Sequence, residues 1–538
     1  MMKRFFSVMV LLMSLGFLVG SIIRAEDPRH FSELNLPESD LQQLKNSLTE
    51  TDRTLLTDLT INQYPSFFDE KTSRWFYSVD PDNLLADPSI GFSAAEKNVK
   101  IAFSGEIIPG GTVPMIAYTD SEFKEYAVEV TTLPLIRIES SGDLFPPDQY
   151  TRQRYPIRFT VFDNRPEALQ KISVSEGEIH IRGWSSRHYD KKGFRLTLYE
   201  KGVSKEDHEN LTPVLGLRSD GDWLLYAAYN DQEKIRNVFS SNLWLVSCGD
   251  DNSFMLNNGM EYRFVELFMD SRYWGLYAFG YPIDPEQMGI RADNKGHYEE
   301  YLFKQKEWGP KKTEAGFKLN GLDLQNKANE SYYRNGIAIL QMYSDQIMAG
   351  APDKLSHNDQ QNPIDIWLFM KLIQAADSVH KTAWEMKNMM FTIKYTDRGR
   401  IILYTPWDMD ISWGNTLNNR ADNLTRAYAI RADNNSYEMA LNPVSVLRKT
   451  DPDIVEMIRA RYAELRADSW SDRNVDDMLD SFEQDIYGSG AYIRDMERWP
   501  DGTYQDPEAG LSVFRKYVHE RFASMDRYID ELTCEMSE

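Results

Sequence analysis

The sequence is poor in cysteine and in basic residues, and each shortage excludes a class of protein. Its two cysteines, Cys248 and Cys534, are too few for a disulfide scaffold or for a thiolate-bound zinc or iron–sulfur centre. A single bridge between them and two separate thiols are both open. Acidic residues outnumber basic ones by 83 to 60, and the net charge of −23 argues against nucleic acid or anionic lipid as a partner.

One long apolar run is present, and it lies at the N-terminus. Lys3 and Arg4 precede the apolar residues 5–23, and the small residue Ala25 comes just before a charged segment. This order predicts a secretory signal peptide over residues 1–25 and therefore a secreted or cell-surface protein. An uncleaved membrane anchor is the alternative, because a run of this length can also span a bilayer. No other segment is long and apolar enough, so we expect no stable membrane span after cleavage.

The first part of the mature chain changes its pattern near residue 75. Residues 31–64 are polar with apolar positions at helical spacing, including Leu55 and Leu59, and we expect a helical segment there. Residues 75–130 alternate between polar and apolar and are interrupted by Pro and Gly, which predicts antiparallel strands. We assign residues 26–130 to an N-terminal helical segment and a small β-sandwich-like module.

The remaining chain, residues 131–538, is rich in strands first and in helices later. Paired alternating runs predict hairpins over 179–198 and 261–281, in a strand-rich lobe that extends to about residue 300. From about residue 330 a helical lobe begins, with helices predicted over 332–348, 364–376, 453–468, 475–486 and 510–532. The expected fold class is α+β, with a two-lobed domain that follows the small antiparallel β module.

A turn rich in serine and basic residues joins the strands of the first hairpin. Arg182, Ser185 and Ser186 form it, and Lys192 and Arg195 follow at the start of the next strand. Backbone amides, hydroxyls and cations of this kind can bind a polyanion such as a phosphate chain. A solvated basic hairpin is the alternative reading of the same residues.

Acidic residues follow two buried elements of the helical lobe. Asp377 comes directly after an apolar helix, where it can orient an acceptor hydroxyl or simply end the helix. Asn388 follows a short loop and can ligate a metal or contact that loop. Asp408 and Asp410 come after the hydrophobic strand 401–406, and two carboxylates at this spacing can hold a hard cation such as Mg²⁺. Their alternative role is to cap the following turn or to pair with an arginine.

The order of these segments matches the needs of phosphoryl transfer. A phosphate-binding turn comes first, a hydroxyl-orienting carboxylate second and metal-binding carboxylates last. The chain has no Walker A motif, no His-Arg-Asp loop and no Asp-Phe-Gly motif, so it does not carry the usual signatures of NTPases or protein kinases.

At these residues the chain resembles the spore-coat CotH family of atypical kinase-like proteins. The resemblance extends from about residue 133 to the C-terminal helices and rests on many short motifs in the same order. They are Arg-Gly-x-Ser-Ser at 182–186, Trp-Leu-Leu at 223–225, Phe-Val-Glu-Leu at 264–267, Asp377, Lys-Asn at 387–388, and Pro-Trp-Asp-x-Asp at 406–410. The preceding β module resembles the small chitobiase C-terminal type of domain.

The resemblance implies an atypical protein-kinase-like fold that uses ATP with Mg²⁺ or Mn²⁺ to modify Ser or Thr of proteins. It gives Asp377 the role of catalytic carboxylate, Asp408 that of principal metal ligand and Asp410 that of its support. The residues that it assigns to nucleotide binding are Arg182, Ser185, Ser186, Lys192, Arg195, Asn388 and Glu266, the last being structural or orienting a basic partner. The chain departs from the family pattern at Trp184 and Thr197, where Asn and a second basic residue are usual.

Three functions are consistent with these residues. The first is an exported ATP- and metal-dependent kinase that transfers phosphate to Ser or Thr of surface proteins, with AMP transfer and glutamylation as variants of the same chemistry. The second is a non-catalytic surface-binding protein, or pseudokinase, which the departures at Trp184 and Thr197 favour. The third, a carbohydrate-processing enzyme, has weaker support, because Asp408 and Asp410 share one element whereas acids that flank a sugar come from separate ones.

Overall fold

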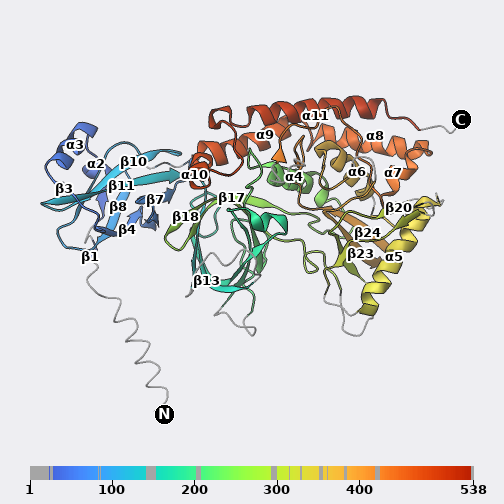
Figure 1. Cartoon of the computed structure of the whole chain (residues 1–538), viewed down its shortest axis with the longest axis horizontal. Helices are drawn as coiled ribbons and strands as arrows, with labels where there is room; N and C mark the ends of the chain where they lie inside the picture. The colour runs from blue at the N-terminus through green and yellow to red at the C-terminus, as the bar shows by residue number, and fades with distance from the viewer. Residues whose placement is uncertain are drawn as a thin grey trace, which may run out of the picture.

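A closed barrel of seven strands lies at the centre of the chain, with a two-sheet module on one side and a helical region on the other (Figure 1). The computed structural model describes residues 23–24, 28–82, 84, 86–140, 153–200, 208–291, 300–313, 316–326, 330–349, 355–359, 361–380, 384–417 and 425–534. Most of the predicted signal peptide, residues 1–25, lies outside the described residues. The architecture is a mixed α+β fold built largely from antiparallel sheets, as the sequence predicts.

Two sheets with a shared apolar core form the module that precedes the barrel. One sheet has the strand order β1–β8–β4–β5 with β2 on β8, and the other has the order β6–β7–β11–β10–β9 with β3 on β11. Side chains of both sheets, such as Leu59 and Val128, join one core together with Phe268 of the barrel, so the module packs directly on the barrel. The elements are β1 (Ile23–Arg24), β2 (Arg29–His30), α2 (Phe31–Leu34), α3 (Glu38–Asn46), β3 (Thr49–Glu50), β4 (Leu56–Ile61), β5 (Tyr64–Pro65), β6 (Phe67–Asp69), β7 (Arg74–Ser78), β8 (Ser89–Ala94), β9 (Lys100–Phe103), β10 (Thr112–Tyr118) and β11 (Glu122–Thr131).

Residues 31–64 are only partly helical, and the prediction of a helix over the whole segment is wrong. Helices α2 and α3 occupy its first part, but strand β4 contains Leu56 and Leu59, and Leu55 immediately precedes that strand. The β4–β8 register shifts between Leu56 and Asp58, and this β-bulge brings Leu56 and Leu59 to the same buried face of the strand. A spacing of three residues along a bulged strand imitates helical spacing, which explains the error.

The barrel strands follow the order β12–β13–β14–β15–β16–β18–β17, and parallel pairing between β17 and β12 closes the barrel. The strands are β12 (Leu135–Ser140), β13 (Tyr155–Phe162), β14 (Ile172–Arg182), β15 (Gly193–Tyr199), β16 (Asp222–Tyr226), β17 (Tyr262–Met269) and β18 (Arg272–Gly280). Both predicted hairpins are confirmed, as β14–β15 and β17–β18. Alternate residues such as Ile181, Phe194 and Leu196 fill the interior, so their neighbours along each strand point outward.

A four-stranded sheet, with the order β22–β19–β23–β24, lies among the helices that follow the barrel. Its strands and the short hairpins beside it are β19 (Tyr301–Gln305), β20 (Lys311–Thr313), β21 (Gly316–Lys318), β22 (Leu322–Leu324), β23 (Met389–Thr396), β24 (Gly399–Pro406), β25 (Thr416–Leu417) and β26 (Thr425–Arg426). The helices are α4 (Arg236–Trp244), α5 (Glu330–Met348), α6 (Asn362–Ile373), α7 (Pro443–Leu447), α8 (Pro452–Ala467), α9 (Asp472–Glu483), α10 (Ala491–Arg498) and α11 (Ser512–Asp530). The predicted helices correspond to α5, α6, α8, α9 and α11, whereas α10 was not predicted.

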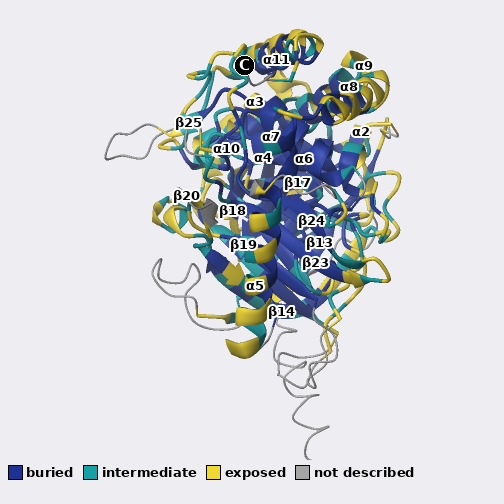
Figure 2. Cartoon of the chain, turned by 90° about the vertical axis from the view of Figure 1, so that its right-hand side faces the viewer, coloured by how far each residue is buried: buried dark blue, intermediate teal, exposed yellow. Residues whose placement is uncertain are grey.

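The helical region has its own apolar core, in which α6 and most of β24 are buried (Figure 2), and side chains of the barrel strands β17 and β18, such as Phe264 and Leu276, also belong to it. Every residue of α6 is buried, which explains why its sequence is largely apolar. Cys248 is buried and Cys534 is half-buried, and both are free thiols. None of the helices that the structure describes is long and apolar enough to cross a membrane.

A buried ion pair ties the turn after β14 to helix α10. Lys191 lies just before β15, and its Nζ is 2.8 Å from Asp495 Oδ1, with both side chains fully buried. Asp495 Oδ1 also accepts a hydrogen bond from Leu276 N–H of β18 at 2.9 Å, and Tyr504 Oη donates to Asp495 Oδ2 at 2.9 Å. Burial lowers the pKa of Lys191, while the charge of Asp495 opposes that shift. One carboxylate therefore connects the turn, the barrel and the C-terminal helices.

We expect Asp495→Ala to destabilise the fold by about 3–5 kcal/mol, because it leaves the Lys191 ammonium buried without its counter-charge. Urea unfolding followed by tryptophan fluorescence measures this change. Glu497→Ala is the control, since Glu497 is 57% exposed on the same helix, and surface changes of this kind stay within about 0.5 kcal/mol. Equal free energies of unfolding for the two variants would contradict the role given to Asp495.

Candidate functional site

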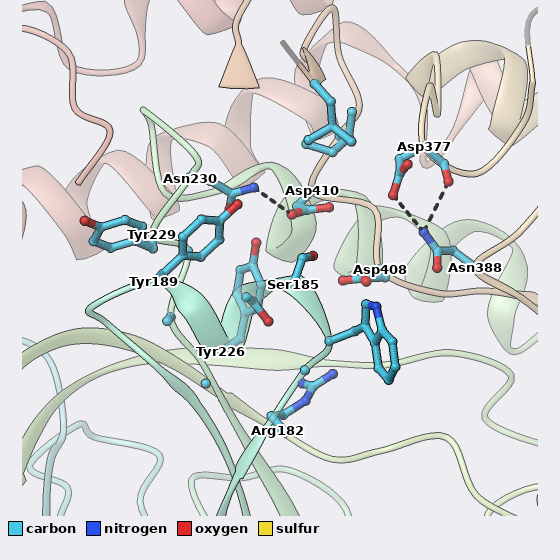
Figure 3. Close-up of a pocket in the computed structure, with 18 of the residues that line it drawn as sticks. Arg182, Ser185, Tyr189, Tyr226, Tyr229, Asn230, Asp377, Asn388, Asp408 and Asp410 are labelled. Atoms are coloured by element: carbon cyan, nitrogen blue, oxygen red, sulfur yellow. Dashed lines mark hydrogen bonds between the residues drawn. The ribbon is translucent and has the colours of Figure 1, made fainter. Parts of the chain in front are cut away.

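A cavity of about 410 Å³ lies where the end of the barrel meets the helical region. Its wall combines the turn after β14, the loop after β16, the segment before β23 and the loop after β24. Figure 3 shows side chains from these segments around one space. Most of the site residues predicted from the sequence line this cavity, namely Arg182, Ser185, Ser186, Asp377, Asn388, Asp408 and Asp410.

Backbone hydrogen bonding brings Asp377 beside the loop that carries Asp408 and Asp410. Ala376, in the turn after α6, donates its N–H to the carbonyl of Ile411 at 3.0 Å. The turn after α6 and the loop after β24 are therefore held against each other. Their carboxylates share one cavity although the segments are separated in sequence by the whole β23–β24 hairpin.

The β23–β24 hairpin places Asn388 and Asp408 at its two ends. Trp407 N–H donates to Asn388 O at 3.0 Å. Asn388 and Asp408 both have left-handed backbones, with φ of 54° and 56°, a strained conformation for residues other than glycine that is concentrated at functional sites. Met409 N–H donates to Asn237 Oδ1 of α4 at 2.9 Å, so a helix holds the strained turn in place.

The three carboxylates are close enough to disturb one another's ionisation. Burial, and then the charges of Asp408 and Asp377, raise the pKa of Asp410 well above its ordinary value. Asn230 Nδ2 donates to Asp410 Oδ2 at 3.3 Å and opposes this shift. Burial also raises the pKa of Asp377, but Lys387 Nζ lies 2.7 Å from Asp377 Oδ1 and favours the charged form. A cation bound among these acids would stabilise them.

The turn after β14 contributes an arginine and two serines to the cavity wall. Gly183 has a φ of 102°, and a Cβ there would collide with Ser186 Oγ, so this turn requires glycine. Arg182 extends toward the loop after β24, and its guanidinium carbon lies 5.5 Å from the centre of the Trp407 ring. Trp184 also lines the cavity, but it is 73% exposed, so its indole does not fill the cavity.

Two basic residues that the sequence assigned to nucleotide binding do not line the cavity. Lys192 Nζ donates to Tyr189 O, and burial lowers the pKa of Lys192. Arg195 forms an ion pair with Asp222 on the neighbouring strand β16. Thr197 Oγ1 also donates to Asp222 Oδ1, at 2.6 Å. The polar side chains on the outward face of β15 therefore bind Asp222 of the neighbouring strand β16.

Glu266 also lies outside the cavity lining, in the interior of the protein. Its carboxylate accepts hydrogen bonds from Arg494 Nε at 2.8 Å and Nη2 at 2.9 Å, and from Tyr273 Oη at 2.8 Å. The side chain of Glu266 is fully buried. The basic partner expected from the sequence is thus Arg494, and this pair fastens α10 to β17.

No motif indicated the aromatic part of the cavity wall. The rings of Tyr189 and Tyr229 stack with centres 5.1 Å apart and an angle of 26° between their planes. Tyr226 and Asn230 stand beside them (Figure 3). These residues come from the turn after β14 and the loop after β16, which meet only because the barrel strands pair. Flat aromatic side chains of this kind can bind a nucleotide base.

Asp408 and Asp410 are suited to be two ligands of a hard divalent cation. They are carboxylates, the ligand type that Mg²⁺ and Mn²⁺ favour, and the raised pKa of Asp410 reflects its burial and its repulsion by Asp408 and Asp377, which a cation would offset. Among the residues that the structure describes, no group of three or more His, Cys, Asp or Glu side chains could hold a metal ion by itself. Water and phosphate oxygens would complete the coordination, as is usual for Mg²⁺.

A family model described as CotH kinase protein matches residues 179–525, which is more than half of the chain. The match begins in β14 and ends in α11, so it includes all the residues that line the cavity. No curated protein matches the chain with significant similarity.

We expect Asp410→Asn to stabilise the protein, and to do so more as the pH rises. Because the pKa of Asp410 is raised in the folded state, its ionised form destabilises the fold above the folded pKa, and this cost fades as the pH falls toward the unfolded pKa. Thermal unfolding without added metal, at about pH 5 and about pH 8, measures the effect.

Asp397→Asn is the control for this change, since Asp397 is exposed in the turn between β23 and β24. It should leave the melting temperature unchanged at both pH values. If Asp410→Asn does not raise the melting temperature, or raises it equally at the two pH values, the electrostatic account of Asp410 is contradicted.

Proposed function

The chain belongs to the CotH kinase protein family, and we propose that it is an exported protein kinase that uses ATP and a divalent cation to phosphorylate Ser or Thr of surface proteins. The observation that carries this proposal is that Asp377, Asp408 and Asp410 line one cavity together with the turn after β14. Export is proposed from the predicted signal peptide over residues 1–25.

Asp377 is the proposed proton acceptor of the reaction. As the hydroxyl oxygen of Ser or Thr bonds to the terminal phosphorus of ATP, its proton passes to Asp377, the bond to the bridging oxygen breaks, and ADP leaves. The ion pair with Lys387 favours the charged form of Asp377, against the effect of burial, which raises its pKa. Asn388 Nδ2 donates to Asp377 O at 3.3 Å and to Asp377 Oδ2 at 3.4 Å, which fixes the carboxylate's orientation. Proton transfer to a positioned base contributes about 10²–10⁴-fold to such a rate.

The remaining cavity wall has the chemistry that ATP requires. Arg182 and the serines of the turn can bind phosphate oxygens, and the stacked Tyr189 and Tyr229 can contact the base. A divalent cation held by Asp408 and Asp410 would neutralise the charge that develops on the phosphates. The cavity volume of about 410 Å³ lies in the range of small-molecule sites.

A non-catalytic nucleotide-binding or surface-binding protein is the second candidate. It is favoured by the contacts of Lys192 and Arg195, whose charged ends bind Tyr189 O and Asp222 of the protein itself. Fewer cations therefore face a bound polyphosphate than the family resemblance implies. AMP transfer and glutamylation would use the same cavity with a different bond broken in ATP.

Incubation of the purified protein with labelled ATP, Mg²⁺ or Mn²⁺ and a Ser/Thr-containing acceptor protein tests the proposal. We expect Asp377→Asn to lower transfer by about 10²–10⁴-fold, because the hydroxyl loses its proton acceptor. Transfer of label from the γ-phosphate but not from the α-phosphate identifies phosphoryl transfer, and the reverse identifies AMP transfer.

Asp397→Asn is the matched control, since it removes an exposed carboxylate outside the cavity lining, and it should label the acceptor as wild-type protein does. Equal labelling by Asp377→Asn and wild-type protein would contradict the assignment of Asp377. Binding of ATP by wild-type protein without any transfer, across a range of acceptors, would favour the non-catalytic candidate.

A further inference from the structure

Three of the basic residues around the turn after β14 are already engaged by other groups of the protein. Lys191 pairs with Asp495, Lys192 donates to a backbone carbonyl, and Arg195 pairs with Asp222. Arg182, Lys191, Lys306 and Lys387 line the cavity, but Lys191 and Lys387 each form an ion pair with an aspartate of the protein. A further lysine, which the sequence motifs did not indicate, lies beside this wall.

Lys304 of β19 lies at the edge of this cavity. Lys304 does not itself line the cavity, but it precedes the lining residue Lys306 by two positions. Lys304 Nζ lies 4.3 Å from the centre of the Trp407 ring, the same ring that Arg182 approaches at 5.5 Å. Trp407 is 8% exposed and immediately precedes Asp408. One indole thus holds two cations beside the proposed metal-binding carboxylate.

The ammonium of Lys304 rests on an aromatic face, and no ion pair joins it to a carboxylate in the part of the chain that the structure describes. The charges that act on it from neighbouring elements are those of Asp408, Arg182, Asp323 and Lys306. Burial lowers the pKa of Lys304 to about 8, so the group is mostly charged at neutral pH. An anionic ligand in the adjoining cavity would provide the counter-charge.

We propose that Lys304, stacked on Trp407 together with Arg182, is a positioning residue for the polyphosphate of the donor nucleotide. This inference rests on the proposed function and assigns the phosphates to the corner of the cavity beside Asp408. Because the interaction is electrostatic, the contribution of Lys304 rises with the number of phosphates on the ligand. Since the ammonium stacks on Trp407 and does not pair with Asp408, both charges stay available to the ligand.

Calorimetric binding of ATP, ADP and AMP, each with Mg²⁺, tests this role in wild-type protein and in Lys304→Met and Lys304→Arg. We expect Lys304→Met to weaken ATP binding by about tenfold and AMP binding by much less, so that the ratio of ATP to AMP affinity falls. Lys304→Arg keeps the charge and should restore that ratio. Lys516→Met, which removes an exposed lysine of α11, is the matched control and should leave the ratio unchanged.

The ratio compares two ligands on one variant, so a partly unfolded fraction of Lys304→Met does not alter it. A wild-type ratio in Lys304→Met would contradict the role of Lys304 while leaving the proposed function intact. If wild-type protein binds none of the three nucleotides, the proposed function itself is contradicted, and the inference with it. The two failures are therefore distinguishable.

Discussion

The buried pair of Lys191 and Asp495 is the contact on which the rest of the site depends. It joins the turn after β14 to α10, and Leu276 N–H of the barrel binds the same carboxylate. Removing either partner would leave the other charge buried without its counter-charge, which is strongly destabilising. The positions of Arg182 and Tyr189 relative to the helical region follow from this connection. The pair also explains why a basic turn does not produce a strongly basic cavity, since one of its lysines holds the fold together.

The cavity brings several carboxylates close together, and their charges are only partly compensated. Asp377 is balanced by Lys387 at 2.7 Å, whereas burial and its acidic neighbours raise the pKa of Asp410 well above its ordinary value. Clustered acids of this kind lower the stability of the protein without a bound cation, and binding of a cation raises that stability. Trp407 brings Arg182 and Lys304 to the same corner, so positive charge stands next to the acids without neutralising them by direct pairing.

The acidic half of the site could be predicted from the sequence because it is encoded locally. Asp377 follows a helix whose residues are all buried, and Asp408 follows strand β24, so a largely apolar segment precedes each of them. The basic half could not be predicted, because the contacts of Lys191 depend on a residue of α10, far along the chain. The stacking of Tyr189 likewise depends on barrel closure. The prediction of a helix near Leu59 is wrong because a β-bulge changes the spacing of the buried residues along strand β4.

The central claim is that Asp408 and Asp410 hold a divalent cation against the phosphates of a nucleotide in this cavity. A crystal structure of the wild-type protein with Mn²⁺ and a non-hydrolysable ATP analogue, with anomalous scattering recorded for manganese, tests it most directly. The account predicts an anomalous peak between these two carboxylates and the phosphates, with the terminal phosphate facing Asp377. A nucleotide bound elsewhere, or phosphates in the cavity with manganese absent from Asp408 and Asp410, would contradict it.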